Sequence, residues 1–366
     1  MPPPMLRVYK RLFPQTSLTS FGHVAGDAGV GEQTMPDKHP VRFGTLGAAQ
    51  ITPNALIKPS LEVRDAEIVA VAARDRKRAE EFAAAHRIGR VHDTYQQVVD
   101  DPEVDVIYNP LPNSHHCQWT IAALRAGKHV LCEKPIASNA AEAQQMAAVA
   151  RESGRFLGEA FHYRYHRLAA RVREILQGGT LGRLRHLEGN FSVPLPANNI
   201  RYDWNLAGGA TMDLGCYPLH MLREFSGLTP RVVKASARIG PPNIDVAMEV
   251  ELELGDGVRG RMTCSMAQDA QIGATFAAHG ELGELYVVNP VAPQMGNQLT
   301  LKTSSGQQQQ SVAGDASYTA QLRAFVARIR GDQSAFPTDG AEGIINMRVI
   351  DDVYRAAGLP PRANAK

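Results

Sequence analysis

The 366-residue sequence has little of several features that mark specialised proteins. Its four cysteines form no CxxC pair, so we expect neither a disulfide framework nor a zinc ribbon. No apolar run approaches the roughly 20 residues that a membrane-spanning helix requires. Lysine and arginine total 39 against 37 acidic residues, and this near-balance is not typical of a nucleic-acid-binding protein. These absences predict a cytoplasmic protein with no membrane or nucleic-acid partner.

Residues 1–40 differ from the rest of the chain. They contain the run Pro2-Pro3-Pro4 and show no hydrophobic periodicity, so we interpret them as a disordered tail or as the product of a start codon placed before Met35. A targeting peptide is the alternative, because several basic residues precede the first acidic residue, Asp27. At about 150 residues per domain, the remaining length predicts two domains.

A short apolar run, Val41–Leu46, predicts a strand that ends in a tight turn. The turn matches part of a G-x-G-x-x-G phosphate-binding motif, with Gly47 in the first place, Ala49 in the second and Thr52 in the third. Pro53 suits the first turn of a helix whose N-terminus would bind a pyrophosphate. Taken alone, the motif also fits any tight strand-to-helix turn. The cofactor-binding residues predicted in this turn are Gly47, Ala49, Gln50 and Ile51.

A second strand, predicted at Glu67–Ala73, ends beside Arg74. In dinucleotide-binding folds a carboxylate at this point binds the ribose 2′-hydroxyl of NAD, whereas an arginine accommodates the 2′-phosphate of NADP. Arg74 and Arg78 therefore predict NADP as the cofactor, with NAD as the second option. As the alternative, both arginines belong to a solvated helix start whose N-cap is Asp75.

Strands and helices then alternate, which is typical of a parallel, doubly wound sheet. The predicted elements are strands at 105–108 and 128–132 and helices at 114–126 and 138–153. Ligands bind beyond the carboxyl ends of such strands, where two polar phrases lie, Asn109–His116 and Glu133–Pro135. The cofactor-binding residues predicted in these phrases are Pro110, Leu111, Asn113, Glu133 and Lys134.

The phrase GKHVLCEKP, which ends in Glu133-Lys134-Pro135, is the most specific feature of the chain. It resembles the glucose–fructose oxidoreductase, inositol dehydrogenase and MocA family of NAD(P)-dependent oxidoreductases. Three further stretches, Gly158–His166, Gly179–Val193 and Gly208–Tyr217, match that family in order, and the resemblance extends from Val41 to Gly358. Within the family the chain is most similar to the NADP-dependent aldose dehydrogenases and the dimeric dihydrodiol dehydrogenases.

The resemblance carries implications for individual residues. It implies a Rossmann domain over residues 41–160, a cofactor-facing His116, a cis peptide bond before Pro135 and a reacting pair formed by Lys134 and Tyr217. The sequence departs from the family pattern at two glycine positions, Ala49 in the phosphate-binding turn and Ala207 before the predicted catalytic helix.

The chemistry explains why such a pair is needed. Oxidation of an alcohol requires a base that takes the hydroxyl proton while a hydride moves to the nicotinamide. Tyr217 is the candidate base, although a free tyrosine has a pKa of about 10. A nearby ammonium group lowers that pKa by favouring the phenolate, and Lys134 fits this part at its strand terminus. A surface lysine is the alternative interpretation.

Further residues of the predicted site carry alternatives of their own. Asp213 lies four residues before Tyr217, so we assign it to a substrate hydroxyl or to orienting the pair, with helix capping as the alternative. Trp204, in the loop before that helix, is expected to cover the substrate. Arg164 is expected to reach the nicotinamide or the substrate, or to begin a solvated helix. His220 is interpreted as structural, and no metal site is predicted.

The second half of the chain changes to the alternation of half-exposed strands. The predicted strands are 186–192, 232–239, 245–254 and 258–266, with a turn at 255–257. They predict an α+β substrate and oligomerisation domain over residues 161–340 with an open, mainly antiparallel sheet. Residues 341–366 are expected to form a helix that packs back on the first domain. Because family members commonly assemble through such a sheet, we expect a homodimer or homotetramer.

These features together predict an NADP-dependent oxidoreductase that transfers a hydride between the nicotinamide and a sugar-like or cyclic polyol alcohol, an aldose or a diol. The predicted substrate-binding residues are Lys134, Trp204, Asp213 and Tyr217. Two alternatives share the fold, a non-catalytic NAD(P)-sensing regulator and an NAD-dependent glycosidase. A pure sensor needs neither Lys134 nor Tyr217, and a glycosidase would show no net reduction of its cofactor.

Overall fold

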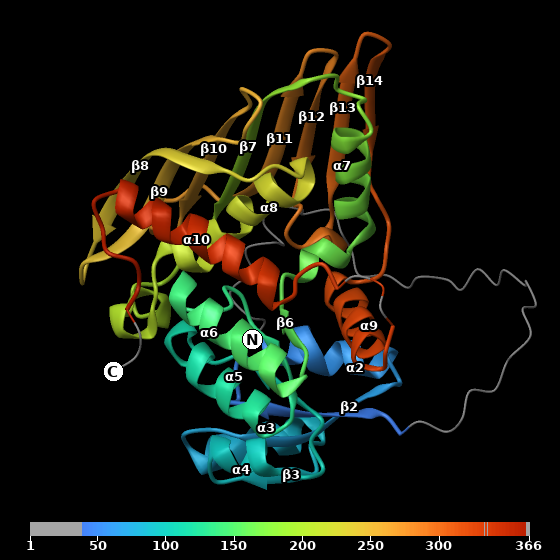
Figure 1. Ribbon diagram of the computed structural model, residues 1–366, viewed down its shortest axis with the longest axis vertical. Helices are drawn as coiled ribbons and strands as arrows, with labels where there is room; N and C mark the ends of the chain where they lie inside the picture. Colours follow the sequence, from blue (N-terminus) through green and yellow to red (C-terminus); the bar gives the residue numbers. More distant parts are fainter. Residues whose placement is uncertain (1–38, 333, 335, 364–366) are drawn as a thin grey trace, which may run out of the picture.

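The computed structural model describes residues 39–332, 334 and 336–363 (Figure 1). The predictions of an N-terminal tail, of a start at Met35 and of a targeting peptide concern residues 1–40, of which residues 1–38 lie outside the described range. The described residues form two sheets with helices packed on them, so the predicted α/β class is confirmed. None of their helices combines the length and the apolar composition of a membrane span.

The first sheet has six parallel strands in the order β3-β2-β1-β4-β5-β6. Its strands are β1 (Val41–Leu46), β2 (Ala66–Ala72), β3 (Arg90–His92), β4 (Val106–Asn109), β5 (His129–Cys132) and β6 (Leu157–Glu159). The winding reverses between β1 and β4, and ligands of doubly wound sheets bind at such a reversal, outside the carboxyl ends of the strands. The predicted parallel sheet is therefore confirmed, although the sequence pattern does not predict the short strands β3 and β6.

Capping contacts fix the ends of the helices in this half. α3 (Arg76–His86) begins at Asp75, whose carboxylate accepts hydrogen bonds from two backbone N–H groups of the first turn. α6 (Ala140–Ser153) begins at Asn139 in the same manner and ends at Gly154. The other helices here are η1 (Pro53–Ile57) with α2 (Lys58–Glu62), α4 (Tyr95–Asp100), and η2 (Asn113–His115) with α5 (His116–Arg125).

The second sheet has eight strands in the order β14-β13-β12-β11-β7-β10-β9-β8. Only the pair β7–β10 is parallel, so the predicted open, mainly antiparallel sheet is confirmed. Its strands are β7 (Leu184–Ser192), β8 (Arg231–Gly240), β9 (Ile244–Glu253), β10 (Arg259–Ser265), β11 (Gly273–Gly280), β12 (Gly283–Val288), β13 (Gln298–Thr303) and β14 (Gly306–Gln310). The glutamine-rich β14 is an exposed edge strand, because its backbone pairs with β13 alone.

One face of this sheet is covered by helices and the other is polar. α7 (Arg167–Gln177), α8 (Cys216–Ser226) and α10 (Gly340–Ala356) lie on the covered face (Figure 1). α8 approaches β7 closely, since a Cβ added at Gly189 would lie 2.8 Å from the side chain of Pro218. On the uncovered face, charged side chains such as Glu249 and Arg261 pair across strands.

Two helices from the end of the chain return to the first domain. α10 packs against α6 as well as against β8, which agrees with the expected packing of the C-terminal helix (Figure 1). α9 (Ser317–Ile329) also returns, because its Phe325 shares a buried cluster with Phe43 of β1 and Tyr108 of β4. Two helices, α9 and α10, therefore join the second domain to the first, and α9 also contacts η3 (His162–Tyr165), the short helix that follows β6.

Candidate active site

The turn after β1 brings the chain close to the loop after β4. Gly47 has a φ of 88°, and a Cβ added there would lie 3.3 Å from the side chain of Leu111. Glycine is therefore favoured both by the backbone conformation and by the space. Gln50 of the same turn is exposed, whereas Ala49 and Ile51 are partly buried. A glycine turn at the reversal of the winding fits the pyrophosphate of a dinucleotide.

Two arginines stand beyond the end of β2. Arg74 is exposed, and Arg78 donates a hydrogen bond from Nη2 to the carbonyl oxygen of Ala48, 2.9 Å away in the turn after β1. The carboxylate of Asp75 serves as the N-cap of α3, so it is occupied by backbone N–H groups. The region thus presents positive charge where the 2′-phosphate of NADP is expected.

The loop after β4 contacts the second domain, and the structure gives its predicted cofactor residues different surroundings. Asn113 donates a hydrogen bond to the carbonyl oxygen of Ala207, 3.0 Å away in the second domain. His116 is fully buried, and its ring nitrogens lie 2.9 Å and 2.7 Å from the carbonyl oxygens of Pro135 and Leu111. A ring held in this way ties two loops together and leaves no nitrogen for a cofactor. The side chains of Pro110 and Leu111 lie beside it, partly or almost fully buried.

The turn after β5 presents the predicted lysine. The peptide bond between Lys134 and Pro135 is cis, as the resemblance implies. Glu133 accepts a hydrogen bond from the Tyr108 hydroxyl at 2.7 Å, and burial raises the pKa of its carboxyl. Lys134 donates from Nζ to the carbonyl oxygen of Asp213 at 2.8 Å. The lysine of the first domain is thus fixed to the backbone of the second.

Asp213, Lys134 and Arg201 form a small ionic group. Asp213 lies in η6 (Thr211–Gly215), a π-helical turn that precedes α8, and its Oδ1 lies 3.6 Å from Lys134 Nζ and 2.6 Å from Arg201 Nε. Burial by itself would raise the pKa of Asp213, but the charges of Arg201 and Lys134 outweigh burial and lower the pKa. The predicted capping alternative is not seen, because no side chain caps η6. The carboxylate instead holds two cations beside Tyr217.

Tyr217 lies at the start of α8, where predicted partners surround it. Lys134 Nζ is 4.7 Å from the centroid of its ring, so the predicted pair does lie together. The ring is 5% exposed and packs against Phe161 and Phe191. Its hydroxyl lies 3.3 Å from Nε2 of His162. A phenol enclosed by aromatic rings, with a cation on one side, can exchange a proton with a small molecule at its exposed edge.

The structure places two other predicted residues elsewhere. Arg164 forms an ion pair with Glu224 and lines the pocket beside α7 and α8, so the structure gives no support to its expected contact with the nicotinamide or the substrate, which stays a prediction. Trp204 of η5 (Trp204–Leu206) stacks on the guanidinium of Arg362, 4.0 Å from the ring centroid. Arg362 in turn bonds Gly208 and the buried Asp245, so Trp204 belongs to a contact that anchors the loop before η6.

Arg201 and His162 are members of the site that sequence reasoning missed. Arg201 stands in η4 (Ile200–Tyr202), within the loop that was expected to cover the substrate, but no spacing singles it out. His162 belongs to the matched phrase GEAFHYRYH, which marks its segment without indicating which side chain faces Tyr217. Only tertiary contacts distinguish them from their neighbours.

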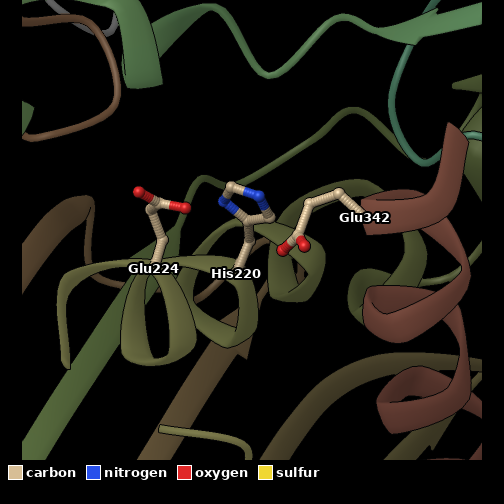
Figure 2. A group of neighbouring side chains, drawn as sticks. All are labelled: His220, Glu224 and Glu342. Atoms are coloured by element: carbon tan, nitrogen blue, oxygen red, sulfur yellow. The ribbon is translucent and has the colours of Figure 1, made fainter. Parts of the chain in front are cut away.

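A second polar cluster is formed by side chains of α8 and α10 (Figure 2). His220, Glu224 and Glu342 bring one nitrogen and two carboxylates within 4.8 Å of one another, which could hold a metal ion. Both carboxylates are already paired with arginines, Glu224 with Arg164 and Arg173, and Glu342 with Arg223. These ion pairs, which line an open pocket of about 590 Å³, make a metal ion electrostatically unfavourable there. The expectation of no metal therefore stays a prediction.

Comparisons with known proteins agree with this geometry. Residues 41–161 match the model of an oxidoreductase family with an NAD-binding Rossmann fold, and residues 169–286 match the GFO/IDH/MocA C-terminal domain. The chain is 32% identical over 318 residues to D-xylose 1-dehydrogenase (NADP(+)) 2 of Haloferax volcanii, which covers 86% of this chain and 97% of that relative. It is 37% identical over 231 residues to the trans-1,2-dihydrobenzene-1,2-diol dehydrogenase of Mus musculus, covering 63% and 69%.

A similar solved structure is that of the 3-ketoreductase KijD10 from Actinomadura kijaniata in complex with NADP and TDP-benzene. It superposes with a TM-score of 0.81 at 26% identity and covers 87% of this chain and 98% of that chain. The agreement in both halves confirms the predicted nicotinamide dinucleotide cofactor and the predicted oxidoreductase class.

Proposed function

Because this chain belongs to the glucose–fructose oxidoreductase, inositol dehydrogenase and MocA family of oxidoreductases, we propose that it transfers a hydride between NADP and a sugar-like or cyclic polyol alcohol. The observation that carries the proposal is the position of Lys134 Nζ, 4.7 Å from the ring centroid of Tyr217 and bonded to the backbone of Asp213. The substrate class comes from the relatives, which are named for D-xylose and for a dihydrobenzene diol.

The residues of this chain divide the work. The glycine turn at Gly47 would hold the pyrophosphate, and Arg74 with Arg78 the 2′-phosphate. Bound NADP supplies the acceptor or donor of the hydride. Tyr217 Oη takes the hydroxyl proton of the alcohol during oxidation and returns it during reduction. The ammonium of Lys134 stabilises the phenolate that Tyr217 forms before it takes this proton and after it returns it.

Asp213 orients this pair. Its Oδ1 holds Arg201 and Lys134, and a carboxylate kept ionised by two cations is also able to accept a hydrogen bond from a substrate hydroxyl. We assign substrate binding to the second domain, which contributes Asp213 and Tyr217 beside Lys134. The polar, uncovered face of the second sheet is the proposed contact of a homodimer or homotetramer, which sedimentation velocity of the purified chain would detect.

Turnover with a substrate panel tests the function. Purified protein is mixed with NADP and a series of aldoses and cyclic diols, and the absorbance of the reduced cofactor is followed. We expect Tyr217→Phe to lower kcat by about 10²- to 10⁴-fold, because a positioned acid–base group contributes that much. Tyr286→Phe, at an exposed tyrosine of β12, is the matched control and should keep wild-type activity. Wild-type turnover by Tyr217→Phe would contradict the proposed mechanism.

The same assay separates the alternatives. If the wild-type protein binds NADP but converts no member of the panel, it would be a sensor. Hydrolysis of a glycoside with no net reduced cofactor would indicate the glycosidase reaction.

The preference for NADP is tested at Arg74. Arg74→Asp should weaken the binding of NADP by roughly 10- to 100-fold, because a hydrogen bond to a charged group contributes about 1.5–3 kcal/mol. The affinity for NAD should change little. Fluorescence titration with each nucleotide gives the two dissociation constants. Lys77→Asp makes the same charge reversal on the exposed first turn of α3 and controls for the general field. Equal losses for NADP and NAD in Arg74→Asp would reject the 2′-phosphate role.

A further inference from the structure

The hydroxyl of Tyr217 continues into a chain of hydrogen-bonding groups that leads away from Lys134. His162 Nε2 lies 3.3 Å from Tyr217 Oη, and His162 Nδ1 lies 2.7 Å from the hydroxyl oxygen of Ser317 at the start of α9. The imidazole is stacked on the ring of Tyr318, with 3.8 Å between centroids. It is 3% exposed, so the stacking and burial fix its orientation.

The directions of these hydrogen bonds follow from the groups at the far end. Ser317 donates its single hydroxyl hydrogen to the amide oxygen of Gln294, 2.9 Å away, so its oxygen must accept from Nδ1–H of His162. Burial, together with the charge of Lys134, lowers the pKa of His162 to about 3, so the ring is neutral. A neutral ring with its hydrogen on Nδ1 has a bare Nε2, which accepts the hydrogen of the Tyr217 phenol.

The far end of this chain reaches the surface. Ser317 is fully buried, whereas Gln294 of η7 (Pro293–Met295) is exposed. Three consecutive groups, a phenol, an imidazole and a hydroxyl, therefore connect the base to a point next to solvent. Each of them can both donate and accept a hydrogen bond, which is what passage of a proton requires.

We propose that His162 and Ser317 form a proton relay that exchanges the proton of Tyr217 with solvent, a role that rests on the proposed function of Tyr217 as the acid–base group. After alcohol oxidation Tyr217 holds the substrate proton as a phenol. Its proton moves to His162 Nε2, the Nδ1 proton moves to Ser317 Oγ, and the Ser317 proton passes to a water molecule that takes the place of the exposed Gln294 amide as its hydrogen-bond acceptor. One proton leaves, Tyr217 becomes a phenolate, and His162 stays neutral with its hydrogen on Nε2. Reduction runs the same transfers in reverse.

The relay makes His162 a positioning and proton-transfer residue that acts through Tyr217. The charged group that acts on its ring is Lys134, and the groups packed against it are Tyr217, Ser317 and Tyr318. If the role of His162 were only structural, any side chain that fills the same space and makes the same two hydrogen bonds could replace it. An amide side chain can make both bonds but cannot pass a proton by changing tautomer. The variants below use this difference.

The deciding experiment compares His162→Gln with the wild type in two measurements. A pH-indicator dye follows proton release during steady-state oxidation of the best substrate of the panel, and we expect His162→Gln to slow it on the order of 100-fold. Added imidazole should restore part of the rate of proton release to His162→Gly. Ser317→Ala should slow proton release in the same way as His162→Gln and enlarge the solvent isotope effect on it. Full-rate proton release by His162→Gln would overturn the relay.

A second measurement is independent of turnover. Nuclear magnetic resonance of the protein with isotope-labelled histidine, without cofactor, should show a neutral His162 with its hydrogen on Nδ1, identified by its loss in His162→Gln. The spectrum is recorded at a pH at which Tyr217 is protonated, where hydrogen on Nε2 would also overturn the relay, because the relay places it there only when Tyr217 is a phenolate. If the wild type itself converts no substrate, the proposed function fails, and this tautomer measurement still decides the arrangement of the chain.

Discussion

Two tyrosine–histidine pairs connect the same two segments and have opposite surroundings. In one, Tyr217 of α8 faces His162 of η3, and in the other, Tyr163 of η3 faces His220 of α8, with 2.5 Å between Tyr163 Oη and His220 Nδ1. Both pairs are enclosed by aromatic rings. Their charged neighbours differ, because Lys134 lies over Tyr217 whereas Glu224 is the charge that acts most strongly on Tyr163.

The charged neighbour decides what each tyrosine can do. Burial, reinforced by the negative charge of Glu224, raises the pKa of Tyr163 well above its usual range, so its hydroxyl stays protonated and serves as a permanent hydrogen-bonding group. At Tyr217 an ammonium group lies over the ring, and a cation in this place favours the phenolate. The same residue types, one turn apart on α8, therefore form the proposed proton-transfer pair and a pair to which we assign only a hydrogen-bonding role. Of three consecutive residues of η3, His162 faces Tyr217, whereas Tyr163 and Arg164 face His220 and Glu224 of the second cluster.

The strongest test of the comparison removes the cation from each side in turn. Lys134→Met should lower kcat by about 10²- to 10⁴-fold, because the phenolate of Tyr217 loses its stabilising charge. Arg164→Met, which removes a cation from the second cluster, should leave kcat within about threefold and instead lower the melting temperature, since Glu224 loses a buried ion pair. Steady-state kinetics and thermal unfolding of both variants provide the measurements. A large loss of kcat in Arg164→Met would show that the two clusters are not separate.

The second test changes the structural tyrosine. Tyr163→Phe leaves His220 Nδ1 buried without its partner, so we expect unfolding to become easier by about 1–3 kcal/mol. The kcat should change little, because Lys134, Tyr217 and His162 keep their contacts. Urea unfolding and steady-state kinetics decide between these effects, and Tyr202→Phe, a partly buried tyrosine whose hydroxyl bonds Met266, is the matched control. Loss of activity without loss of stability would assign Tyr163 to the reaction.

Most of the fold could be predicted from apolar runs and turn residues. Eight of the strands begin and end within two residues of their predicted positions, because they carry clear hydrophobic patterns: β4 is buried throughout, and β9 alternates between buried and exposed residues over most of its length. β3 has only three residues, all of them partly exposed, so it has no such pattern. β14 consists of exposed polar residues and owes its conformation to pairing with β13.

The candidate site divides in the same way. Lys134 and Tyr217 belong to phrases with a characteristic spacing, so their role could be proposed from sequence, and the structure brings them together. Arg164 and His116 stand in equally recognisable phrases but face other groups, because a phrase does not fix the direction of each side chain. Arg201 is brought to Asp213 by folding alone.

The last test concerns stability alone and changes Glu159, which interacts with charged groups of both clusters. It is buried at the end of β6 and accepts a hydrogen bond from the Ile136 N–H at 2.8 Å. The charge of Glu342 raises its pKa, whereas the charges of Arg223 and Lys134 lower it. Burial, the largest cause, raises its pKa from 4.5 to about 8. A carboxyl whose pKa is raised in the folded state favours folding fully below its unfolded pKa, and this contribution is lost as the pH rises through the folded value.

Glu159→Gln should therefore remove a decline in the free energy of unfolding between pH 4.5 and about 8. The decline amounts to at most about 1.4 kcal/mol per pH unit for one proton, and glutamine keeps the bond from Ile136 without titrating. Urea unfolding of both proteins across this range gives the two curves, which should approach each other at acidic pH and separate toward pH 8, with the variant the more stable. Parallel curves would mean that Glu159 is ionised throughout this range. The positive charges of Lys134 and Arg223 would then lower the pKa of Glu159 by more than burial raises it.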